Sequence, residues 1–161
     1  MSKRMHAGKI GFTCGSFDLL HAGHVLMLEE ARSVCDHLVV GLQTDPTKDR
    51  KSKNRPVQGL EERDIQLRAI KHVDEIIVYA TEAELVELLK TLKPDVRIVG
   101  ADHKGESFTG SELPIEIYFN TRDHGWSTTD LRNRVYREEY RRRVIEERDE
   151  LNASFLSENR Y

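Results

Sequence analysis

The 161-residue sequence has few cysteines, no long apolar run and little excess of charge of either sign. Its two cysteines, Cys14 and Cys35, match no spacing of metal-ligating cysteines, so we expect reduced thiols and a cytoplasmic setting. No apolar stretch approaches the roughly 20 residues that cross a bilayer, so we expect no membrane partner. The net charge is −3, and no overall basic field favours a nucleic-acid partner.

The two ends of the chain differ from its middle. Residues 1–6 carry positive charge with no apolar segment behind them, so we do not expect a signal peptide. Residues 131–150 contain seven arginines and six acids, which is typical of a solvated helix; a dimer-forming helix and an RNA-contacting arm are the alternatives. We therefore expect one domain over residues 1–135 and a helical extension over residues 136–161.

Between these ends, segments with strand character alternate with segments of helical periodicity. Several of the strand segments are continuously apolar, as in strands buried on both faces of a sheet. This alternation predicts an α/β, Rossmann-like, doubly wound parallel sheet of about five strands, with helices on both faces and a C-terminal helical extension. The expected strands are Ile10–Cys14, His37–Leu42, Glu75–Tyr79, Val96–Val99 and Ile115–Phe119; the expected helices are Gly23–Cys35, Leu60–Val73, Glu82–Leu92 and a long one from Thr128.

The segment Gly15–His24 lies between the first expected strand and the first expected helix. Ligands of such sheets bind at the carboxyl ends of the strands, where this segment falls. The first turn of a helix leaves backbone N–H groups unpaired and carries partial positive charge. His21 and His24 are three residues apart, so both face the same way on a helical turn. The pattern predicts a phosphate-binding corner.

The same ten residues, Gly-Ser-Phe-Asp-Leu-Leu-His-Ala-Gly-His, resemble the signature G-[ST]-F-D-x-x-H-x-G-H of the cytidylyltransferase-like nucleotidyltransferases. That family joins a nucleoside triphosphate to a phosphorylated alcohol or sugar and releases pyrophosphate. The resemblance implies that His21 and His24 are catalytic and also bind the nucleotide. It further implies nucleotide binding by Gly15, Ser16 and Phe17, and acceptor binding by Asp18.

A second segment, Arg122–Thr129, follows the last expected strand. Ser127 with Asp130 forms an S-x-x-D capping box, and capping alone accounts for one of the three consecutive hydroxyls. The segment resembles the family's second signature, R-[TS]-x-G-[IV]-S-T-T. This resemblance implies a catalytic, nucleotide-binding Arg122 and hydroxyl donors to the nucleotide from Ser127, Thr128 and Thr129.

The loop after the second expected strand carries five basic residues between Lys48 and Arg55 and lacks apolar residues. It is either a solvated linker or a mobile loop that closes over a triphosphate and neutralises its charge. Family members carry a lysine-bearing loop here. The match in position implies a catalytic Lys51 and a nucleotide-binding Lys53.

Three further residues are candidates. Arg63 lies in the first turn of a helix, where a cation is favourable only beside an anion, and the family's E-x-R pattern implies contact with the nucleotide phosphates. A surface salt bridge is the alternative for Arg63. Gly100 and Asp102 match the family's G-x-D at the nucleoside pocket, although a simple turn also explains them.

The resemblance implies in-line attack at the α-phosphorus of CTP by a phosphorylated alcohol. Leu19-Leu20 and Trp126–Thr129 are similar to glycerol-3-phosphate cytidylyltransferases, which makes glycerol 3-phosphate the first expected acceptor. Ala80–Glu84 lacks the Trp and Lys of that group. An adenylyltransferase acting on heptose 1-phosphate is therefore the alternative, followed by an archaeal-type FAD synthetase and a non-catalytic nucleotide-binding module. We expect Mg²⁺ to arrive with the triphosphate, no metal cage of side chains, and the homodimer common in the family.

Overall fold

The computed structural model describes residues 8–158, so the charged segment 1–6 lies outside the described residues. The chain forms two compact units, Met1–Gly125 and Trp126–Tyr161. The division falls before the boundary that the sequence predicts after residue 135. The first unit holds the whole sheet, and the second is built around one long helix.

The first unit contains one five-stranded sheet in the order β3-β2-β1-β4-β5, and every neighbouring pair is parallel. The buried apolar runs of the sequence become the central strands, as expected. This arrangement confirms the predicted Rossmann-like sheet. The strands are β1 (Ile10–Gly15), β2 (His37–Gln43), β3 (Glu75–Tyr79), β4 (Val96–Val99) and β5 (Glu116–Phe119).

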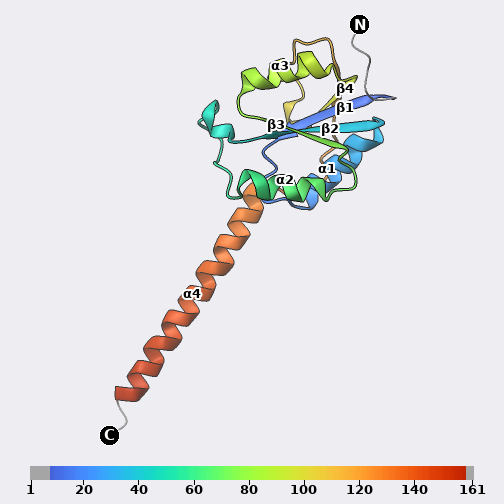
Figure 1. The fold of residues 1–161 in the computed structure, drawn as a ribbon. Helices are drawn as coiled ribbons and strands as arrows, with labels where there is room; N and C mark the ends of the chain where they lie inside the picture. The colour runs from blue at the N-terminus through green and yellow to red at the C-terminus, as the bar shows by residue number, and fades with distance from the viewer. Residues whose placement is uncertain (1–7, 159–161) are drawn as a thin grey trace. The chain divides into compact units, whose positions relative to one another are not determined.

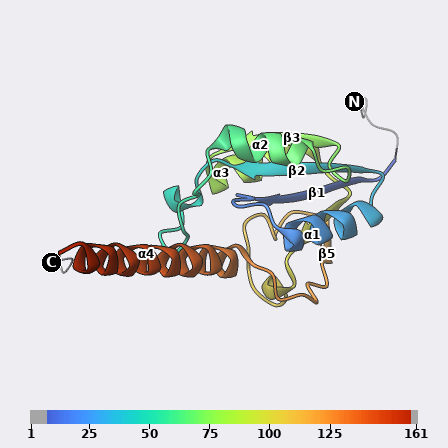
Figure 2. The same ribbon diagram turned by 90° about the horizontal axis from the view of Figure 1, so that it is seen from below.

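Helices cover both faces of the sheet (Figures 1 and 2). α1 (Ala22–Ser33) and α2 (Leu60–Arg68) lie on one face, and α3 (Glu82–Leu92) lies on the other. Each face has its own apolar core. Leu28 and Leu67 belong to the core on the α1 and α2 side, whereas Leu85 and Leu89 belong to the core on the α3 side.

The order of the strands places the site. The chain adds β2 and β3 on one side of β1, and then places β4 and β5 on the other side. The loops that leave the carboxyl ends of β1 and β4 therefore run in opposite directions, and sheets of this kind bind ligands in the crevice between loops so arranged. The expected phosphate corner follows β1, and Gly100 follows β4, so both lie at this switch in strand order.

The second unit is dominated by α4 (Thr128–Glu158). The Ser127 hydroxyl accepts the Asp130 N–H at 3.1 Å, which confirms the predicted cap. Ion pairs one turn apart, such as Arg134 with Asp130 and Arg143 with Glu139, support the helix along its length. Neither α4 nor any other helix in residues 8–158 is long and apolar enough to cross a membrane.

Candidate active site

The loop between β1 and α1 has an unusual backbone. Phe17 and Leu19 both adopt left-handed conformations, with φ of 48° and 50°, which side chains other than glycine seldom occupy. Phe17 is 3% exposed and packs into the core on the α1 side, and the Leu19 N–H donates to Gln58 Oε1 at 2.7 Å. The core and Gln58 thus hold the loop in a conformation that is locally unfavourable, as is common at functional sites.

The two histidines begin α1 and cap it together. His21 is the N-cap residue, and its Nδ1 accepts the N–H of Gly23 at 3.1 Å. His24, three residues on, accepts the His21 N–H on its own Nδ1 at 3.4 Å. The two rings stack with their centroids 4.0 Å apart. One reciprocal capping box therefore fixes both imidazoles at the positive end of the helix dipole.

The capping bonds also decide which nitrogen carries the proton. A nitrogen that accepts a hydrogen bond is unprotonated, so each neutral ring has its N–H at Nε2. Burial, with His21 beside it, lowers the pKa of His24 to about 3, and the positive charge of Arg122 acts in the same direction. His24 is therefore a neutral hydrogen-bond donor at physiological pH.

Asp18 is buried and engages the backbone of a distant segment. Its side chain is 4% exposed, and its Oδ1 accepts two backbone N–H groups, from Val57 and Gln58, both at 2.9 Å. A carboxylate held in this way positions the chain before α2. The expected contact of Asp18 with the acceptor stays a prediction.

Arg63 is likewise buried, at 2% exposure. Its guanidinium donates to four backbone carbonyls: Nε to Gln58, Nη1 to Ser16 and Gln43, and Nη2 to Thr44, over 2.7–3.2 Å. Three of these carbonyls lie just at or after the ends of β1 and β2, and the fourth, that of Gln58, lies just before α2. Arg63 therefore ties these segments together, and its expected contact with the nucleotide phosphates stays a prediction.

The other side of the crevice is formed by the ends of β4 and β5. Asn120 is 4% exposed; its Oδ1 accepts the Ala101 N–H at 3.1 Å, and its own N–H donates to Val99. Arg122 follows, in a left-handed conformation with φ of 43°, and its Nη1 lies 3.3 Å from Asp102 Oδ2. A side chain at Gly100 would displace the Asp102 carboxylate from its present position.

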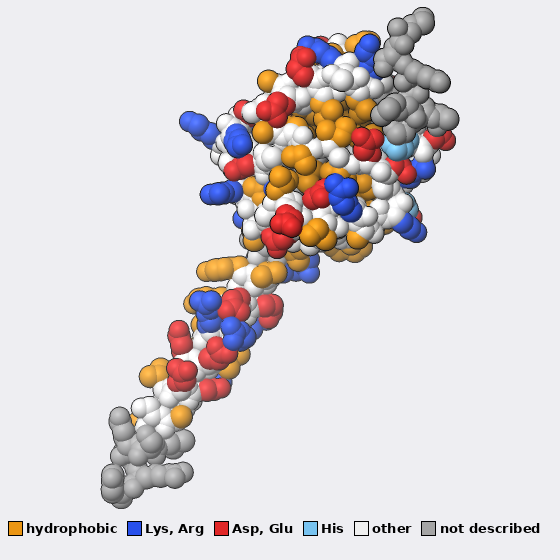
Figure 3. Space-filling model, viewed as in Figure 1, with side chains coloured by type: hydrophobic (Ala, Val, Ile, Leu, Met, Phe, Trp, Pro, Cys, Tyr) orange, Lys and Arg blue, Asp and Glu red, His pale blue; other side chains and the backbone are white. Residues whose placement is uncertain are grey.

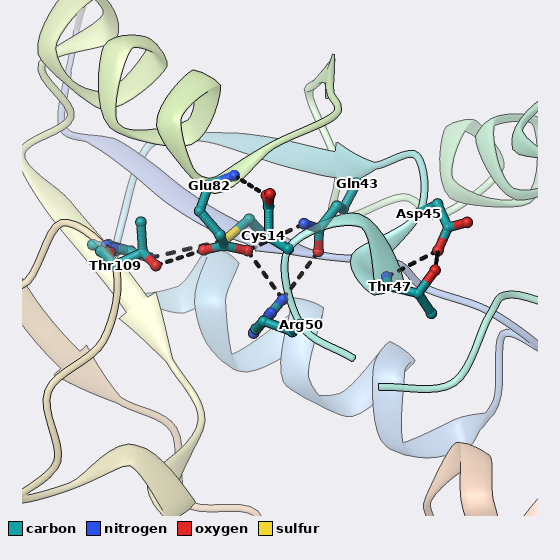
Figure 4. Close-up of polar contacts among 9 residues, drawn as sticks. Cys14, Gln43, Asp45, Thr47, Arg50, Glu82 and Thr109 are labelled. Carbon is teal, nitrogen blue, oxygen red and sulfur yellow. Dashed lines mark hydrogen bonds and ion pairs between the residues drawn. The ribbon is translucent and has the colours of Figure 1, made fainter. Parts of the chain in front are cut away.

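A polar network crosses the carboxyl edge of the sheet on the α3 side (Figure 4). Glu82, at the start of α3, is its centre. Its Oε1 lies 3.1 Å from Gln43 Nε2 and 3.2 Å from Arg50 Nη2, and its Oε2 accepts the Thr109 hydroxyl at 2.5 Å. Gln43 Oε1 accepts from the same Arg50 nitrogen. One carboxylate thus joins the loop after β2 to the loop after β4.

The neighbouring residues extend this network. Arg97 on β4 donates to the Thr109 carbonyl and reaches Cys14 Sγ at the end of β1. Burial raises the pKa of the Cys14 thiol, so this cysteine is protonated and is not an activated nucleophile. This agrees with the prediction of a packed thiol.

The basic loop begins at this network. Asp49 accepts the Glu82 N–H at 2.7 Å, and Arg50 is bound to Glu82 and Gln43, so the base of the loop is fixed. Lys51 and Lys53 follow directly and are exposed. The loop therefore consists of an anchored base and a solvent-facing part that carries both candidate lysines.

The structure brings some predicted residues together and not others. His21 and His24 are held together by their capping bonds and stacked rings, and the charge of Arg122 helps to lower the pKa of His24. The Ser16 carbonyl accepts a hydrogen bond from Arg63. The Phe17 ring lies tilted against the His24 ring, with the two centroids 5.4 Å apart. Gly15 ends β1 beside them. Ser127, Thr128 and Thr129 belong to the second unit, which we describe by itself, so their role beside the histidines stays a prediction.

Sequence reasoning missed four residues of this edge. Gln58, Glu82, Arg97 and Asn120 are all engaged by contacts between distant segments. Of these four residues, only Arg97 could have been noticed in the sequence, because a cation inside an apolar strand must have a partner.

A parallel sheet with a phosphate-binding corner at its strand-order switch defines a Rossmann-like nucleotide-binding domain. The chain belongs to the cytidylyltransferase-like family, which matches residues 12–134. The match includes both signatures and confirms the family that the sequence resembles. The family is one of nucleotidyltransferases, which places the chain among transferases.

Two bacterial proteins named HldE are similar to this chain in sequence. The bifunctional protein HldE of Campylobacter fetus is 40% identical over 77% of this chain and 27% of its own length. HldE of Rhodospirillum rubrum is also 40% identical, over 83% of this chain and 28% of its own length. The chain therefore spans about a quarter of the length of these relatives.

Solved structures share the fold. A lipopolysaccharide core biosynthesis protein from Thermoplasma volcanium has a TM-score of 0.57 at 26% identity, over 70% of this chain and 94% of its own. A pantothenate synthetase from Thermus thermophilus, at a TM-score of 0.53 and 17% identity over 70% of this chain and 55% of its own, supports the fold alone.

Proposed function

We propose that this chain is an adenylyltransferase, which transfers AMP from ATP to a sugar phosphate such as heptose 1-phosphate. The observation that carries the reaction type is the stacked, mutually capping pair His21 and His24 at the positive end of α1. The acceptor rests on the relatives: two proteins named HldE are 40% identical, and a structural neighbour is described as a lipopolysaccharide core biosynthesis protein. Sugar phosphates fit this group better than the glycerol 3-phosphate first expected.

In the proposed reaction a phosphate oxygen of the acceptor attacks the α-phosphorus of the triphosphate in line with the leaving group. A new P–O bond forms, the bond between the α-phosphorus and the bridging oxygen breaks, and pyrophosphate leaves with that electron pair. The attacking oxygen is already anionic, so the protein needs no general base. Its task is to bring two anions together and to stabilise the charge that builds up on the α-phosphate.

The described residues fit this task. His21 and His24 donate from Nε2 to the α-phosphate and stabilise the charge that develops there. Arg122, whose charge lowers the pKa of His24, counters the charge of the phosphates. Its partner Asp102 borders the nucleoside together with Gly100. Lys51 and Lys53 close over the triphosphate from the basic loop, and Gly15, Ser16 and Phe17 shape the floor. Ser127, Thr128 and Thr129 add hydroxyl donors.

The proposal includes Mg²⁺ as part of the bound nucleotide. No group of three His, Cys, Asp or Glu side chains in the described part of the chain is arranged to hold a metal ion. Magnesium commonly binds through substrate phosphates and keeps several waters, so it does not require such a group. Its chemistry there is to neutralise phosphate charge. We derive no role for a particular side chain toward it.

The experiment is pyrophosphate release by the purified chain, with ATP or CTP paired with heptose 1-phosphate or glycerol 3-phosphate, and mass spectrometry of the product. We expect ATP with heptose 1-phosphate to give ADP-heptose at the highest kcat/KM. CDP-glycerol as the main product would restore the glycerol-phosphate reading, which Leu19-Leu20 and Trp126–Thr129 favour. If the chain binds nucleotide but forms no product in any pairing, it is a non-catalytic nucleotide-binding module.

A further inference from the structure

The helix α4 carries an exposed apolar stripe, and hydrophobic side chains lie on its surface in Figure 3. At 3.6 residues per turn, its large apolar side chains do not scatter evenly: five of them fall within roughly 100° of arc. These five are between 45% and 72% exposed. The rings of the first two stack on each other, 6.3 Å between centroids, so the stripe is ordered where it starts. The five are Tyr136, Tyr140, Val144, Leu151 and Phe155.

The charges of α4 are separated along its length. Residues 128–143 contain six arginines and three acids, whereas residues 144–155 contain one arginine and four acids. The first half is thus net basic and the second half net acidic by the same amount. Two copies aligned in parallel would place basic half against basic half. Two copies aligned antiparallel would place each basic half against an acidic half.

The apolar stripe has the same symmetry. If two helices pair antiparallel about the point between Ile145 and Glu146, Tyr136 of one copy lies at the level of Phe155 of the other. At that register Tyr140 meets Leu151, and Val144 meets Glu147, the one acid within the stripe. The charge pattern favours the antiparallel orientation, and the apolar stripe sets the register within that orientation.

We propose that α4 is a self-association surface, and that its partner is α4 of a second copy of this chain in antiparallel orientation. The paired stripes bury on the order of 1,000 Å² over the two copies, about the lower limit for a specific interface. The proposal concerns α4 alone and does not depend on the reaction proposed above. It gives the expected homodimer a definite interface.

The first test is sedimentation equilibrium of the full chain. We expect a dimer, and we expect Tyr140→Glu or Leu151→Glu to weaken it at least about 30-fold, because each dimer then buries two charges in the stripe. The matched control is Val135→Glu, an exposed residue on the opposite side of the same helix, which should leave the dimer intact. A wild-type monomer, or a dimer that is unaffected by both stripe variants, would overturn the proposal.

A second test reads the orientation. Chains with Tyr140→Cys are mixed with chains carrying Leu151→Cys and oxidised gently, and unmodified chain reports any background from Cys14 and Cys35. Antiparallel pairing predicts disulfide-linked heterodimers between the two variants and little linkage of either variant to itself. Efficient linkage of Tyr140→Cys to itself would show parallel pairing and contradict the proposal.

Discussion

At the scale of single residues, the two histidines have a structural role beside their proposed chemical one. Each uses Nδ1 to cap α1, which places the N–H of the neutral ring on Nε2. The capping bonds therefore do more than stabilise the helix, because they fix the tautomer and the orientation of both rings before a nucleotide arrives. A site whose donors are already oriented does not have to reorganise during the reaction.

The cap can be separated from the chemistry. Asparagine is a good N-cap residue and alanine is a poor one, so His21→Ala should lower the free energy of unfolding by about 1 kcal/mol and His21→Asn by much less. Both variants lose the imidazole, so both should lose turnover. Chemical denaturation measures the first quantity and pyrophosphate release the second. Equal stability of the two variants would show that the His21 cap contributes nothing.

The low pKa of His24 predicts how stability depends on pH. In the unfolded chain a histidine takes up a proton near pH 6.5, whereas in the folded protein His24 resists protonation until about pH 3. Between these values the unfolded state binds more protons, so stability should fall as the pH is lowered from about 6.5 toward 3. The melting temperatures of wild type and His24→Gln should converge on acidification. A constant difference between pH 7 and pH 4 would contradict the assignment.

Arg63 offers a test of its bonds to backbone carbonyls. Arg63→Met removes the donors of four backbone bonds and leaves buried oxygens unpaired, which should cost about 3 kcal/mol of stability. Arg68→Met, in the same helix but paired only with Asp64 at the surface, should cost less than about 0.5 kcal/mol. Urea denaturation of both variants measures the two losses of stability. Equal losses would show that the backbone bonds of Arg63 do not stabilise the fold.

At the scale of elements, the sequence was most informative where one local pattern determines the structure. The expected range of β3 and of α3 is the observed one, because apolar runs and apolar periodicity are local signals. The predicted end of α2 at Val73 was wrong, because the helix ends at Arg68. Ile70 and Val73 continue the apolar periodicity, but they pack on the core from the turn that follows the helix. Periodicity reports which side chains are buried, and a turn can bury them as well as a helix.

The candidate site follows the same rule. The histidine corner was predictable because its residues are adjacent in sequence. The burial of Asp18 and Arg63 was not, since their partners are backbone groups about 20 to 50 residues away. A carboxylate or guanidinium in a motif looks the same in sequence whether it contacts a ligand or supports the loop that does.

The polar network around Glu82 predicts that the base of the basic loop controls nucleotide affinity. Glu82→Gln keeps the shape of the side chain but removes the charge that holds Arg50. Because Lys51 and Lys53 follow Arg50 directly, we expect KM for the nucleotide to rise several-fold while kcat changes less. Glu87→Gln, on the same helix and paired only with Lys90, should leave both constants unchanged. Identical kinetics in wild type and Glu82→Gln would show that the polar network around Glu82 does not affect nucleotide binding through the basic loop.

At the scale of the whole molecule, the fold assembles one site from distant parts of the chain. The strand order places the loop after β1 opposite the loops after β4 and β5, and buried polar residues such as Arg63 and Asn120 fix the ends of the strands. The chemistry is then carried by a few groups at the rim. The helix α4 adds a surface of a different kind, suited to a second copy.

The central claim is that the imidazoles of His21 and His24 bind the phosphate that is transferred. It is tested most directly by the rate of the chemical step in His24→Ala, measured in a single turnover with saturating nucleotide and acceptor. The account predicts a fall of about 100- to 1,000-fold with the far-ultraviolet spectrum of the fold retained. A single-turnover rate equal to that of the wild type would contradict it.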